Sequence, residues 1–371
     1  MAKREKAAPE LATAPGTSPL LTRLVDKIIT KHGDESGVIE GAHGVSLKIK
    51  GVISTQASEL DEALGRGGIP QGRLTVFTGS DGCGKTTGAL HIVAEAQRMG
   101  GLGVYCDKEH KLDLDYAATI GVDVPNMPIA QPDHLEGVLA VMETWTELAK
   151  EWRAERGADV PVVFVLDSTN SALTKSQFDG AWDDVTVGAQ SRVFSAKLPK
   201  LVAMAQRNNI TLLFIGQVRE KIGVMYGKKS DISGGKSLKH HACCIIEFAR
   251  ISTKSIGGSK GKDGKTTGGT AIGNEVKAKV TKNQIAPPFR EAQIFLRFGT
   301  GWDQLAGLFK ASVKRKLIEK SGAWFSLCEG MGGDRLGQGE EKAQEFLREN
   351  PKLQTALKKA LKEKNHDKAG E

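Results

Sequence analysis

The sequence predicts an α/β fold built on a mostly parallel sheet. Four short apolar runs at 74–78, 102–106, 162–166 and 211–215 indicate strands, and helical segments separate them. Continuous apolar strands are typical of a sheet that helices cover on both faces, and alternation with helices is typical of parallel connections. A glycine-rich turn follows the first strand and leads directly into the next helix, which fits the same fold class.

The N-terminal region differs in character from this core. Residues 1–18 are basic and rich in Ala and Pro, lack an apolar run, and are expected to form a disordered arm. Residues 19–48 then contain a short amphipathic helix. Its apolar stripe consists of Leu21, Leu24, Val25 and Ile28. Because a short isolated helix is marginally stable, we expect it to dock on the core or on another subunit.

Periodicity predicts the remaining elements of the core. Helices are expected over 86–99 and 134–152. The segments 275–281 and 291–298 alternate apolar with polar residues, which predicts an antiparallel extension with one solvent-facing side. The segment 252–270 is rich in Gly and Lys, has no periodicity, and is predicted to be a loop.

The core is expected to span residues 49–302, with a small α+β domain over 303–371. This last part is mostly helical in pattern and rich in lysine, and it ends on the basic sequence KKALKEKNHDKAGE. No internal repeat is visible, which argues against an ATPase with a duplicated core.

Composition favours a polyanionic partner. The 371 residues carry a formal net charge of +8, so nucleic acid and an anionic membrane surface are both candidates. No apolar run approaches the roughly 18 residues needed to span a bilayer. The five cysteines form no C-x-x-C pair, which argues against a zinc ribbon or a disulfide framework and fits a reducing, cytoplasmic location.

One motif is specific enough to predict chemistry. Residues 79–86 have the sequence GSDGCGKT and match G-x-x-x-x-G-K-[ST], the phosphate-binding loop. Lys85 is expected to reach the β- and γ-phosphate oxygens of ATP, and the Thr86 hydroxyl to ligate Mg²⁺. The predicted nucleotide-binding residues of this segment are Gly79, Ser80, Asp81, Gly82, Cys83, Gly84, Lys85, Thr86 and Thr87.

Acidic residues after two of the strands are candidates for the rest of the ATP site. Asp167 ends the strand 162–166, where a carboxylate that holds the magnesium ion would lie. Hydrolysis also needs a group that orients and deprotonates a water. Glu109 and Asp107 both follow the strand 102–106 at the carboxyl edge of the sheet, and spacing alone does not choose between them.

A segment of mixed basic and apolar residues begins at Gln217, where the strand 211–215 ends. Its sequence, QVREKIGVMYGKKSDISGG, shows neither helical nor strand periodicity. Such a loop suits nucleic-acid contact, because cations bind phosphates and apolar side chains pack against bases. An ordinary mobile surface loop is the alternative.

Taken together, these segments resemble the RecA recombinase family over about residues 21–361. The most specific matches are QVREKIGVMYG and KLIEKSGAW, and YCDKEHKLDLDYA, VLDSTNSALT, GGKSLKHHA and VTKNQIAPPF support them. The resemblance implies an ATP-dependent DNA recombinase that polymerises on single-stranded DNA, searches duplex DNA for homology and promotes strand exchange in recombination and repair. It also implies a helical filament with ATP and Mg²⁺ between adjacent subunits, and the helix within 19–48 docked on the next subunit.

The resemblance also assigns roles within the ATP site. It implies that Glu109 is the catalytic carboxylate and that Asp113 and Tyr116 contact the adenine. Gln217 would sense the γ-phosphate and pass that signal to the loop it opens. Lys282 would reach the γ-phosphate of the neighbouring subunit.

Two DNA-binding loops follow from the same resemblance, at 178–188 and 217–235. Lys277 and Lys279 would receive the duplex. The domain 303–371 departs from the family in ending on a basic segment in place of an acidic tail, and its lysines are expected to add phosphate contacts to the same duplex. The residues expected to contact single-stranded DNA are Val187, Gly188, Arg192, Arg219, Lys221, Ile222, Gly223, Gly234 and Gly235. A repressor or a single-strand-binding protein is a further candidate partner.

The sequence departs from the family pattern at several points. Gln284 stands where the family usually has a second lysine, and Lys108 stands in place of a small residue between Asp107 and Glu109. The loss of a cation at Gln284 motivates one alternative, a filament protein that coats DNA with little ATP turnover. A hexameric helicase or repair ATPase with the same fold is the other, and the lack of a zinc motif or duplicated core weakens it.

Overall fold

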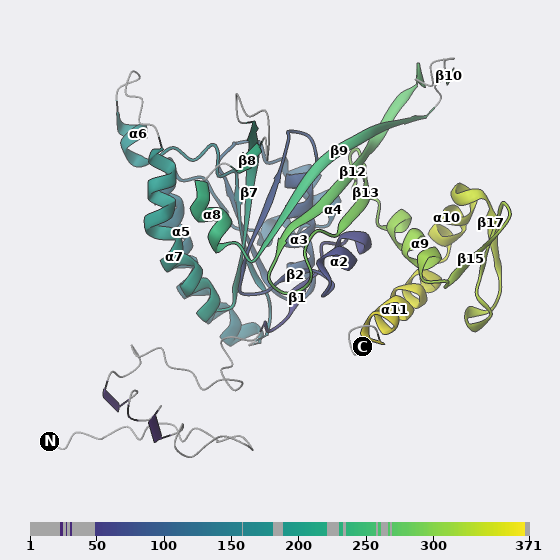
Figure 1. Ribbon diagram of the computed structural model, residues 1–371, viewed down its shortest axis with the longest axis horizontal. Coiled ribbons are helices and arrows are strands. Elements are labelled where there is room, and N and C mark those ends of the chain that lie inside the picture. The colour runs from purple at the N-terminus through teal and green to yellow at the C-terminus, as the bar shows by residue number, and fades with distance from the viewer. Residues whose placement is uncertain are drawn as a thin grey trace. The chain divides into compact units, whose positions relative to one another are not determined.

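The computed structural model describes residues 23, 24, 27, 30, 31, 49–157, 159–180, 188–220, 230–232, 235–256, 259–260, 266–267 and 269–367. The chain divides into two units, Met1–Ile49 and Lys50–Glu371. In the first unit, the described residues from 23 to 31 are helical, where the apolar stripe predicts a helix. The second unit contains a large sheet, the helices that cover it and a small C-terminal domain (Figure 1).

The large sheet is mixed, with a parallel centre. Its strands are β3 Leu74–Gly79, β4 Leu102–Asp107, β5 Ile129–Ala130, β6 Val162–Asp167, β7 Ile210–Glu220, β8 Ser230–Ile232, β9 Cys244–Ile256, β12 Thr270–Asn283, β13 Glu291–Arg297 and β14 Gly301–Trp302. They are arranged in the order β14-β13-β12-β9-β3-β7-β6-β4-β5, and β8 pairs with β7. The six strands from β9 to β5 are parallel, whereas β12, β13 and β14 are antiparallel to their neighbours. The predicted parallel sheet with an antiparallel extension is confirmed.

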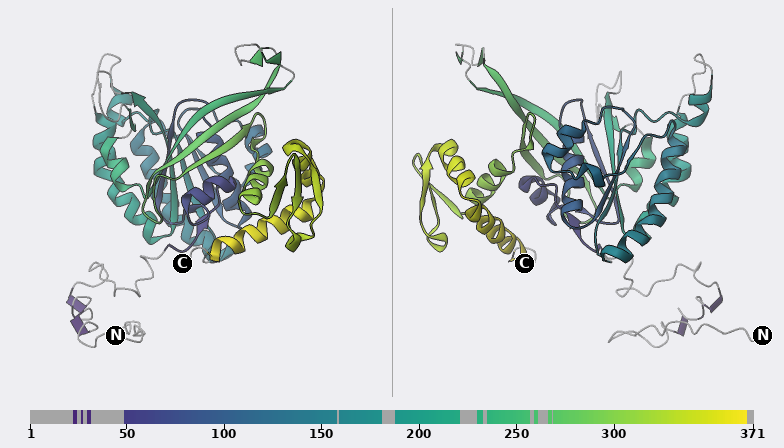
Figure 2. Two further views of the ribbon diagram at one scale, coloured as in Figure 1. Left: turned by 45° about the vertical axis from the view of Figure 1, so that its right-hand side comes forward. Right: turned by 180° about the vertical axis from the view of Figure 1, so that it is seen from behind.

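Helices cover both faces of the sheet (Figures 1 and 2). Their bounds are α2 Ser58–Leu64, α3 Lys85–Arg98, α4 Leu114–Ile120, α5 Leu135–Arg156, α6 Lys175–Asp179, α7 Ala189–Arg207 and α8 Gly235–His241, with a 3-10 turn at Val124–Asn126. One apolar cluster joins α2, α3 and α4 to one face, and a second joins α5, α7 and α8 to the other. A short antiparallel pair, β1 Val52–Ile53 with β2 Ile69–Pro70, adjoins the first cluster.

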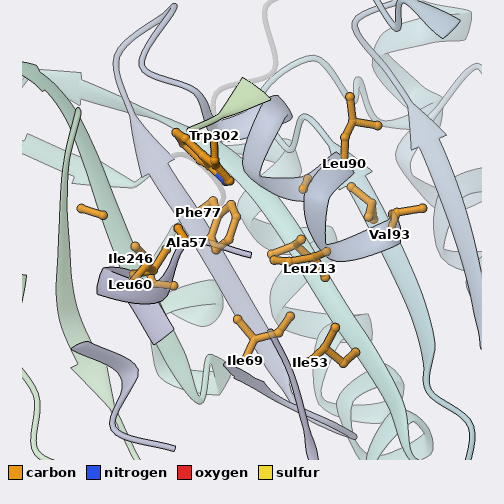
Figure 3. Packing of buried hydrophobic residues seen from close by; sticks show 14 of the residues in the cluster. Ile53, Ala57, Leu60, Ile69, Phe77, Leu90, Val93, Leu213, Ile246 and Trp302 are labelled. Carbon is orange, nitrogen blue, oxygen red and sulfur yellow. The ribbon is translucent and has the colours of Figure 1, made fainter. Parts of the chain in front are cut away.

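The alternation of side chains along each strand explains why the strands are apolar throughout. In β6, Val163 and Val165 belong to the cluster under α3, whereas Phe164 and Leu166 belong to the cluster under α5 and α7. Because successive side chains point to opposite faces and both faces are covered, almost every position is apolar, with the buried Thr75, Thr78 and Thr211 as exceptions. Figure 3 shows the first cluster, in which Phe77 packs beside Trp302.

The prediction of a loop over 252–270 is wrong for most of the residues described there, which belong to strands. β9 continues to Ile256 and β12 begins at Thr270, so the two strands form a long antiparallel ribbon that runs on to β10 Ser259–Lys260 and β11 Thr266–Thr267 (Figure 1). Polar cross-strand contacts hold this ribbon in place of apolar ones. The Ser252 hydroxyl donates to the Glu275 carboxylate at 2.9 Å, and Lys254 pairs with the same carboxylate at 2.8 Å. A strand stabilised in this way carries no apolar periodicity.

The second predicted DNA loop, 217–235, is also more ordered at its ends than expected. β7 continues through Gln217 to Glu220 and pairs with β8, with Val218 opposite Ile232. Gly235 already belongs to α8. The pairing satisfies the backbone N–H and C=O groups of both segments, which the mixed composition did not reveal. Similarly, the predicted loop 178–188 starts inside α6, and the helix predicted over 134–152 extends to Arg156.

The C-terminal domain is α+β, as predicted. Its elements are α9 Gln304–Lys314, β15 Ile318–Ser321, β16 Trp324–Leu327, β17 Arg335–Gln338, α10 Gly339–Glu349 and α11 Pro351–Asp367, with a 3-10 turn at Glu329–Met331. The three strands form an antiparallel sheet with its own apolar cluster, in which Phe309 and Phe325 meet edge to face. In the part of the chain that the structure describes, no helix combines the length and apolarity of a membrane span.

Candidate nucleotide and DNA site

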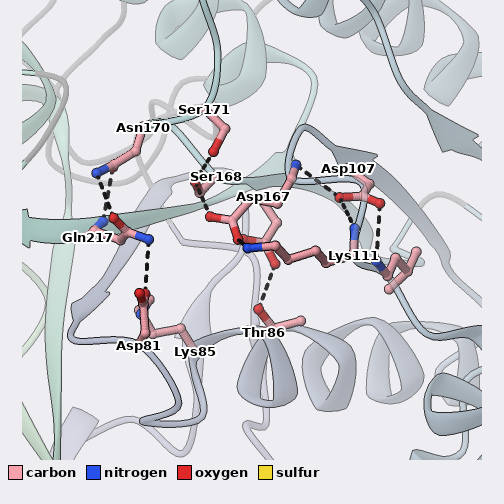
Figure 4. Close-up of polar contacts among 12 residues, drawn as sticks. Asp81, Lys85, Thr86, Asp107, Lys111, Asp167, Ser168, Asn170, Ser171 and Gln217 are labelled. Carbon is pink, nitrogen blue, oxygen red and sulfur yellow. Dashed lines mark hydrogen bonds and ion pairs between the residues drawn. The ribbon is translucent and has the colours of Figure 1, made fainter.

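The phosphate loop connects β3 to α3 at the carboxyl edge of the parallel strands (Figure 4). At Gly79, which has a φ of +150°, a Cβ would lie 2.2 Å from the carbonyl oxygen of Phe248. At Gly84, with a φ of +90°, it would lie 2.9 Å from the Trp302 ring. Only glycine therefore lets β9 and β14 pack this closely against the loop. Cys83 is fully buried, and its sulfur lies 3.9 Å from the Lys85 ammonium group.

The two residues that end the motif already have oxygen partners. The Lys85 ammonium group donates to the carbonyl oxygens of Gly79 at 3.0 Å and Ser80 at 2.7 Å, so it lies inside the loop. The Thr86 hydroxyl donates to the Asp167 carboxylate at 2.7 Å, across from the end of β6. The structure thus brings together the predicted lysine, hydroxyl and carboxylate of a magnesium–nucleotide site.

Asp167 lies in a setting that suits a cation. Burial raises the pKa of its carboxyl group, and the nearby Glu109 and Asp107 carboxylates raise it further, whereas hydrogen bonds from Thr86 and Tyr105 lower it. A divalent cation beside Asp167 would offset this concentration of negative charge. Mg²⁺ usually binds through one or two protein oxygen ligands together with phosphate oxygens and waters, and Thr86 with Asp167 fits that pattern.

The structure separates the two candidates for the catalytic carboxylate. Asp107 is 3% exposed and accepts hydrogen bonds from the backbone N–H groups of Glu109 at 3.2 Å and Leu112 at 3.2 Å, so it shapes the turn after β4. Glu109 accepts a hydrogen bond of 2.7 Å from the Ser168 hydroxyl, and 22% of its side chain is exposed. Of these two carboxylates, Glu109 is the one that a water at the edge of the sheet can reach.

The residues predicted to contact adenine lie together at the start of α4. The Asp113 side chain caps this helix by accepting from the backbone N–H of Tyr116 at 2.9 Å. The Tyr116 hydroxyl lies 3.0 Å from the hydroxyl of Thr87, which follows the phosphate loop. This contact fixes the tyrosine ring relative to the first turn of α3.

Gln217 connects the phosphate loop to the strand that leads into the second DNA loop. It lies beside Gly79 in the register of β3 and β7. Its side-chain amide donates to the Asp81 carboxylate at 2.9 Å, and its backbone N–H donates to the Asn170 side chain at 3.0 Å (Figure 4). A shift of β7 would therefore change or break the hydrogen bond to Asp81 in the phosphate loop.

Lys282 lies away from the phosphate loop of its own subunit. Its ammonium group donates to the carbonyl oxygens of Lys239 and His240, both at 2.9 Å, at the C-terminal end of α8. Burial lowers the pKa of this amine. Gln284 is exposed beside it, and its backbone N–H donates to the carbonyl oxygen of Cys243. Lys282 is thus held by the helix that follows the second predicted DNA loop.

The two lysines predicted to receive duplex DNA share one carboxylate. Lys277 and Lys279 lie on the same side of β12, two residues apart, and Glu291 on β13 stands opposite Lys279. Glu291 pairs with Lys277 at 2.7 Å and with Lys279 at 3.1 Å. All three side chains are close to 40% exposed, at 41%, 42% and 39%. Together the two lysines and the glutamate carry a net charge of +1, compared with +2 for the lysines alone.

Of the first predicted DNA loop, the structure describes residues 178–180 and Gly188. Gly188 has a φ of +74° and is the N-cap of α7. Arg192 is exposed on the first turn of that helix, where the positive end of the helix also favours phosphate. Arg219 and Gly235 belong to β7 and α8. The predicted contacts Val187, Lys221, Ile222, Gly223 and Gly234 lie outside the described residues.

Two further residues, to which the sequence pattern assigned no role, lie in the site. Ser168 holds Glu109, and Asn170 holds the backbone of Gln217. Both follow Asp167 directly after β6. Polar residues after a parallel strand lie at the edge where ligands bind, so this position was the available signal.

Comparison with known proteins agrees with this geometry. The RecA N-terminal domain family matches residues 20–303, and the RecA C-terminal domain family matches residues 306–366. The chain is 41% identical to Protein RecA of Sulfurovum sp. over 312 residues, which cover 84% of this chain and 83% of that relative. It is 39% identical to Protein RecA of Syntrophobacter fumaroxidans over 324 residues, covering 87% and 86%. A third Protein RecA, from Pseudarthrobacter chlorophenolicus, is 37% identical over 354 residues, covering 95% and 93%.

These matches cover both the sheet-containing core and the C-terminal domain. They do not favour a hexameric helicase or repair ATPase as the alternative. The chain belongs to the RecA family of DNA recombinases.

Proposed function

We propose that this chain is a DNA-dependent ATPase that assembles on single-stranded DNA, pairs it with homologous duplex DNA and exchanges the strands. The observation that carries the proposal is the direct hydrogen bond between Gln217 and Asp81. It joins the phosphate loop to the strand that opens into the second DNA loop. A protein that only bound ATP, or only bound DNA, would have no use for this connection.

Nucleotide binding rests on the phosphate loop in this proposal. Lys85 exchanges the carbonyl oxygens of Gly79 and Ser80 for phosphate oxygens, and the loop N–H groups bind the remaining ones. Thr86 and Asp167 hold Mg²⁺, which when bound would neutralise charge on the β- and γ-phosphates. Asp113 and Tyr116 hold the base. The close packing of the two glycines supports a loop shaped for phosphate.

Hydrolysis rests on Glu109 in this proposal. The Ser168 hydroxyl donates to one carboxylate oxygen, Oε1. The exposed Lys111 ammonium group lies 3.4 Å from the other, Oε2, which orients a water and accepts its proton when this long contact opens. Lys282 supplies positive charge to the γ-phosphate of the neighbouring subunit, where it would stabilise the transition state. That role requires Lys282 to leave the carbonyl oxygens at the end of α8.

DNA binding involves three surfaces in this proposal. The loops 178–188 and 217–235 hold single-stranded DNA, and Lys277 with Lys279 receives the duplex together with the domain 303–371. The helix within 19–48 links neighbouring subunits into a filament. The location is the cytoplasm, which the five free thiols support. A repressor or a single-strand-binding protein is a further partner of such a filament.

Steady-state ATP hydrolysis with and without single-stranded DNA tests the proposal. A DNA-dependent ATPase turns over ATP much faster when DNA is present, and the stimulation requires Mg²⁺. Gln284, which stands in place of a second cation, is the observation that motivates the alternative candidate, a filament protein that coats DNA with little ATP turnover. That protein would bind DNA in the presence of ATP. It would hydrolyse ATP at the same slow rate with or without DNA.

A further inference from the structure

Lys108 is a lysine buried in the wall of the ATP site. It lies between Asp107 and Glu109, directly after β4, and is only 7% exposed. Burying an ammonium group is unfavourable unless acceptors surround it. The structure provides them, because the Lys108 ammonium group donates to the carbonyl oxygens of Pro132 and, at 3.2 Å, Asp133. The backbone N–H of Lys108 is also engaged, donating to the carbonyl oxygen of Asp167 at 2.6 Å.

These bonds join the segment that carries Glu109 to the segment before α5. Gln131 adds a weaker contact between the same two segments, from its side-chain amide to Asp107 at 3.4 Å. Because Lys108 and Glu109 are neighbours in the chain, the position of the Glu109 carboxylate depends on where Pro132 and Asp133 hold Lys108.

The segment before α5 is in turn joined to α6. The backbone N–H of Leu135 donates to the carbonyl oxygen of Leu173 at 2.7 Å. The Glu136 carboxylate accepts from the backbone N–H of Lys175, the first residue of α6, at 2.8 Å. The last two residues of α6, Phe178 and Asp179, begin the first predicted DNA loop. A series of contacts therefore runs from the described start of that loop to Lys108.

We propose that Lys108 is a positioning residue that couples DNA at the first loop to the placement of Glu109. This inference rests on the proposed function and adds a second connection to the one through Gln217. DNA that shifts α6 moves the start of α5, and the two carbonyl bonds of Lys108 transmit the shift to the turn that holds Glu109. Ser168 holds the same carboxylate from the other side, so the loss of Lys108 weakens the coupling without removing it.

The test compares ATP turnover with and without single-stranded DNA in matched variants. Lys108→Met keeps the length of the side chain and removes its donors. Lys200→Met is the control, since Lys200 is exposed on α7 and its ion pair with Glu143 is not one of the contacts in this series. We expect Lys108→Met to lower the DNA stimulation of kcat by roughly 2- to 30-fold, the range for residues that carry coupling without touching a ligand. The KM for ATP stays close to that of the unmodified protein, and Lys200→Met leaves both quantities unchanged.

A second variant keeps the inference testable if Lys108→Met folds poorly. Glu136→Ala removes the acceptor at the far end of the same series, on a residue that is partly exposed. It should lower the stimulation in the same direction. The double variant should lose less than the product of the two single effects, because contacts in one series are not independent. Lys108→Arg, which retains the donors, should restore part of the stimulation.

Three results would overturn the inference. Equal stimulation in Lys108→Met and the unmodified protein would remove Lys108 from the coupling. A loss of stimulation accompanied by a higher KM and a lower melting temperature, with Glu136→Ala unaffected, would reduce Lys108 to a structural role. If single-stranded DNA does not raise ATP turnover in the unmodified protein, the proposed function fails and the inference fails with it.

Discussion

Gln217 and Asp81 stand 136 residues apart in the sequence and are joined by a hydrogen bond of 2.9 Å. The bond crosses from β7 to the phosphate loop, so a γ-phosphate that draws the Gln217 amide away from the Asp81 carboxylate would also act on the strand that leads to the second DNA loop. Thermodynamic linkage requires the reverse as well: DNA that moves β7 must alter the affinity for nucleotide.

The variant Gln217→Met tests this connection, because it keeps the volume of the side chain and removes its polar atoms. In the unmodified protein we expect ATP to change DNA affinity by about 5- to 150-fold, the usual span of coupling between two sites. In Gln217→Met we expect this change to be lost. The measurement is DNA affinity with and without a non-hydrolysable ATP analogue. Asp81→Asn, which keeps an acceptor oxygen, should retain most of the effect. A Gln217→Met protein with full coupling would show that the bond to Asp81 is incidental.

Replacing the two acidic residues after β4 should give different phenotypes. Glu109→Gln should keep nucleotide binding and slow turnover by at least about 100-fold, the scale expected for loss of a general base. Asp107→Asn removes charge from a buried acceptor of several backbone N–H groups, so it should lower the melting temperature. Nucleotide binding, turnover and thermal unfolding distinguish the two. Normal turnover in Glu109→Gln would reassign the base to Asp107.

Glu291 should limit the affinity for duplex DNA, because its carboxylate pairs with both Lys277 and Lys279 and offsets one of their two positive charges. Glu291→Gln frees both lysines for phosphates, so duplex binding should tighten. The slope of log affinity against log salt should steepen by up to about 1.8, since each neutralised phosphate contributes roughly 0.9. Glu143→Gln is the matched control, a carboxylate of similar exposure that pairs with Lys200. Parallel salt titrations for both variants would contradict the assignment of these lysines.

His91 should make folding stability depend on pH in the mildly acidic range. Its ring accepts from the backbone N–H of Trp302 at 2.9 Å and lies 2.8 Å from the Gln56 side chain, so the neutral form fits the site. Burial lowers the pKa of His91 to about 4, from an ordinary value of 6.5. Above 6.5, neither state binds a proton and stability is unaffected.

As the pH falls from 6.5 toward 4, the unfolded chain takes up a proton that the folded chain cannot, so stability is lost. The loss should reach about 3 kcal/mol at the lower end of this window. Urea unfolding between pH 7 and 4.5 measures it, and His91→Gln should show a shallower dependence on pH. Identical slopes in the two proteins would mean that other groups control the acid sensitivity.

Much of the fold could be predicted because its signals are local. The apolar runs of β3, β4, β6 and β7 are continuous, since helices cover both faces of the sheet, and the phosphate loop is a contiguous motif. The outer part of β9, residues 252–256, could not be predicted to be a strand, because contacts such as Ser252 with Glu275 stabilise it and leave no apolar pattern. The continuation of β7 to Glu220 depends on pairing with β8, which lies beyond nine intervening residues.

The candidate site shows the same division. Lys85, Thr86 and Asp167 were predictable because a motif and a strand end place them. Spacing alone did not distinguish Glu109 from Asp107, and only the family resemblance favoured Glu109. The structure adds that Asp107 is buried and accepts from backbone N–H groups, whereas Glu109 is partly exposed. The roles of Ser168 and Lys108 depend on partners 59 and 24 residues away. Such pairings follow from tertiary structure alone.

Strand exchange between circular single-stranded DNA and homologous linear duplex DNA tests the central claim most directly. The reaction is run with ATP, with a non-hydrolysable analogue and with no nucleotide, and heterologous duplex serves as the control. The account predicts joint molecules and exchanged products with ATP and homologous duplex, joint molecules with the analogue, and neither without nucleotide or homology. A protein that coats the single strand in the presence of ATP and never forms joint molecules with homologous duplex would contradict it.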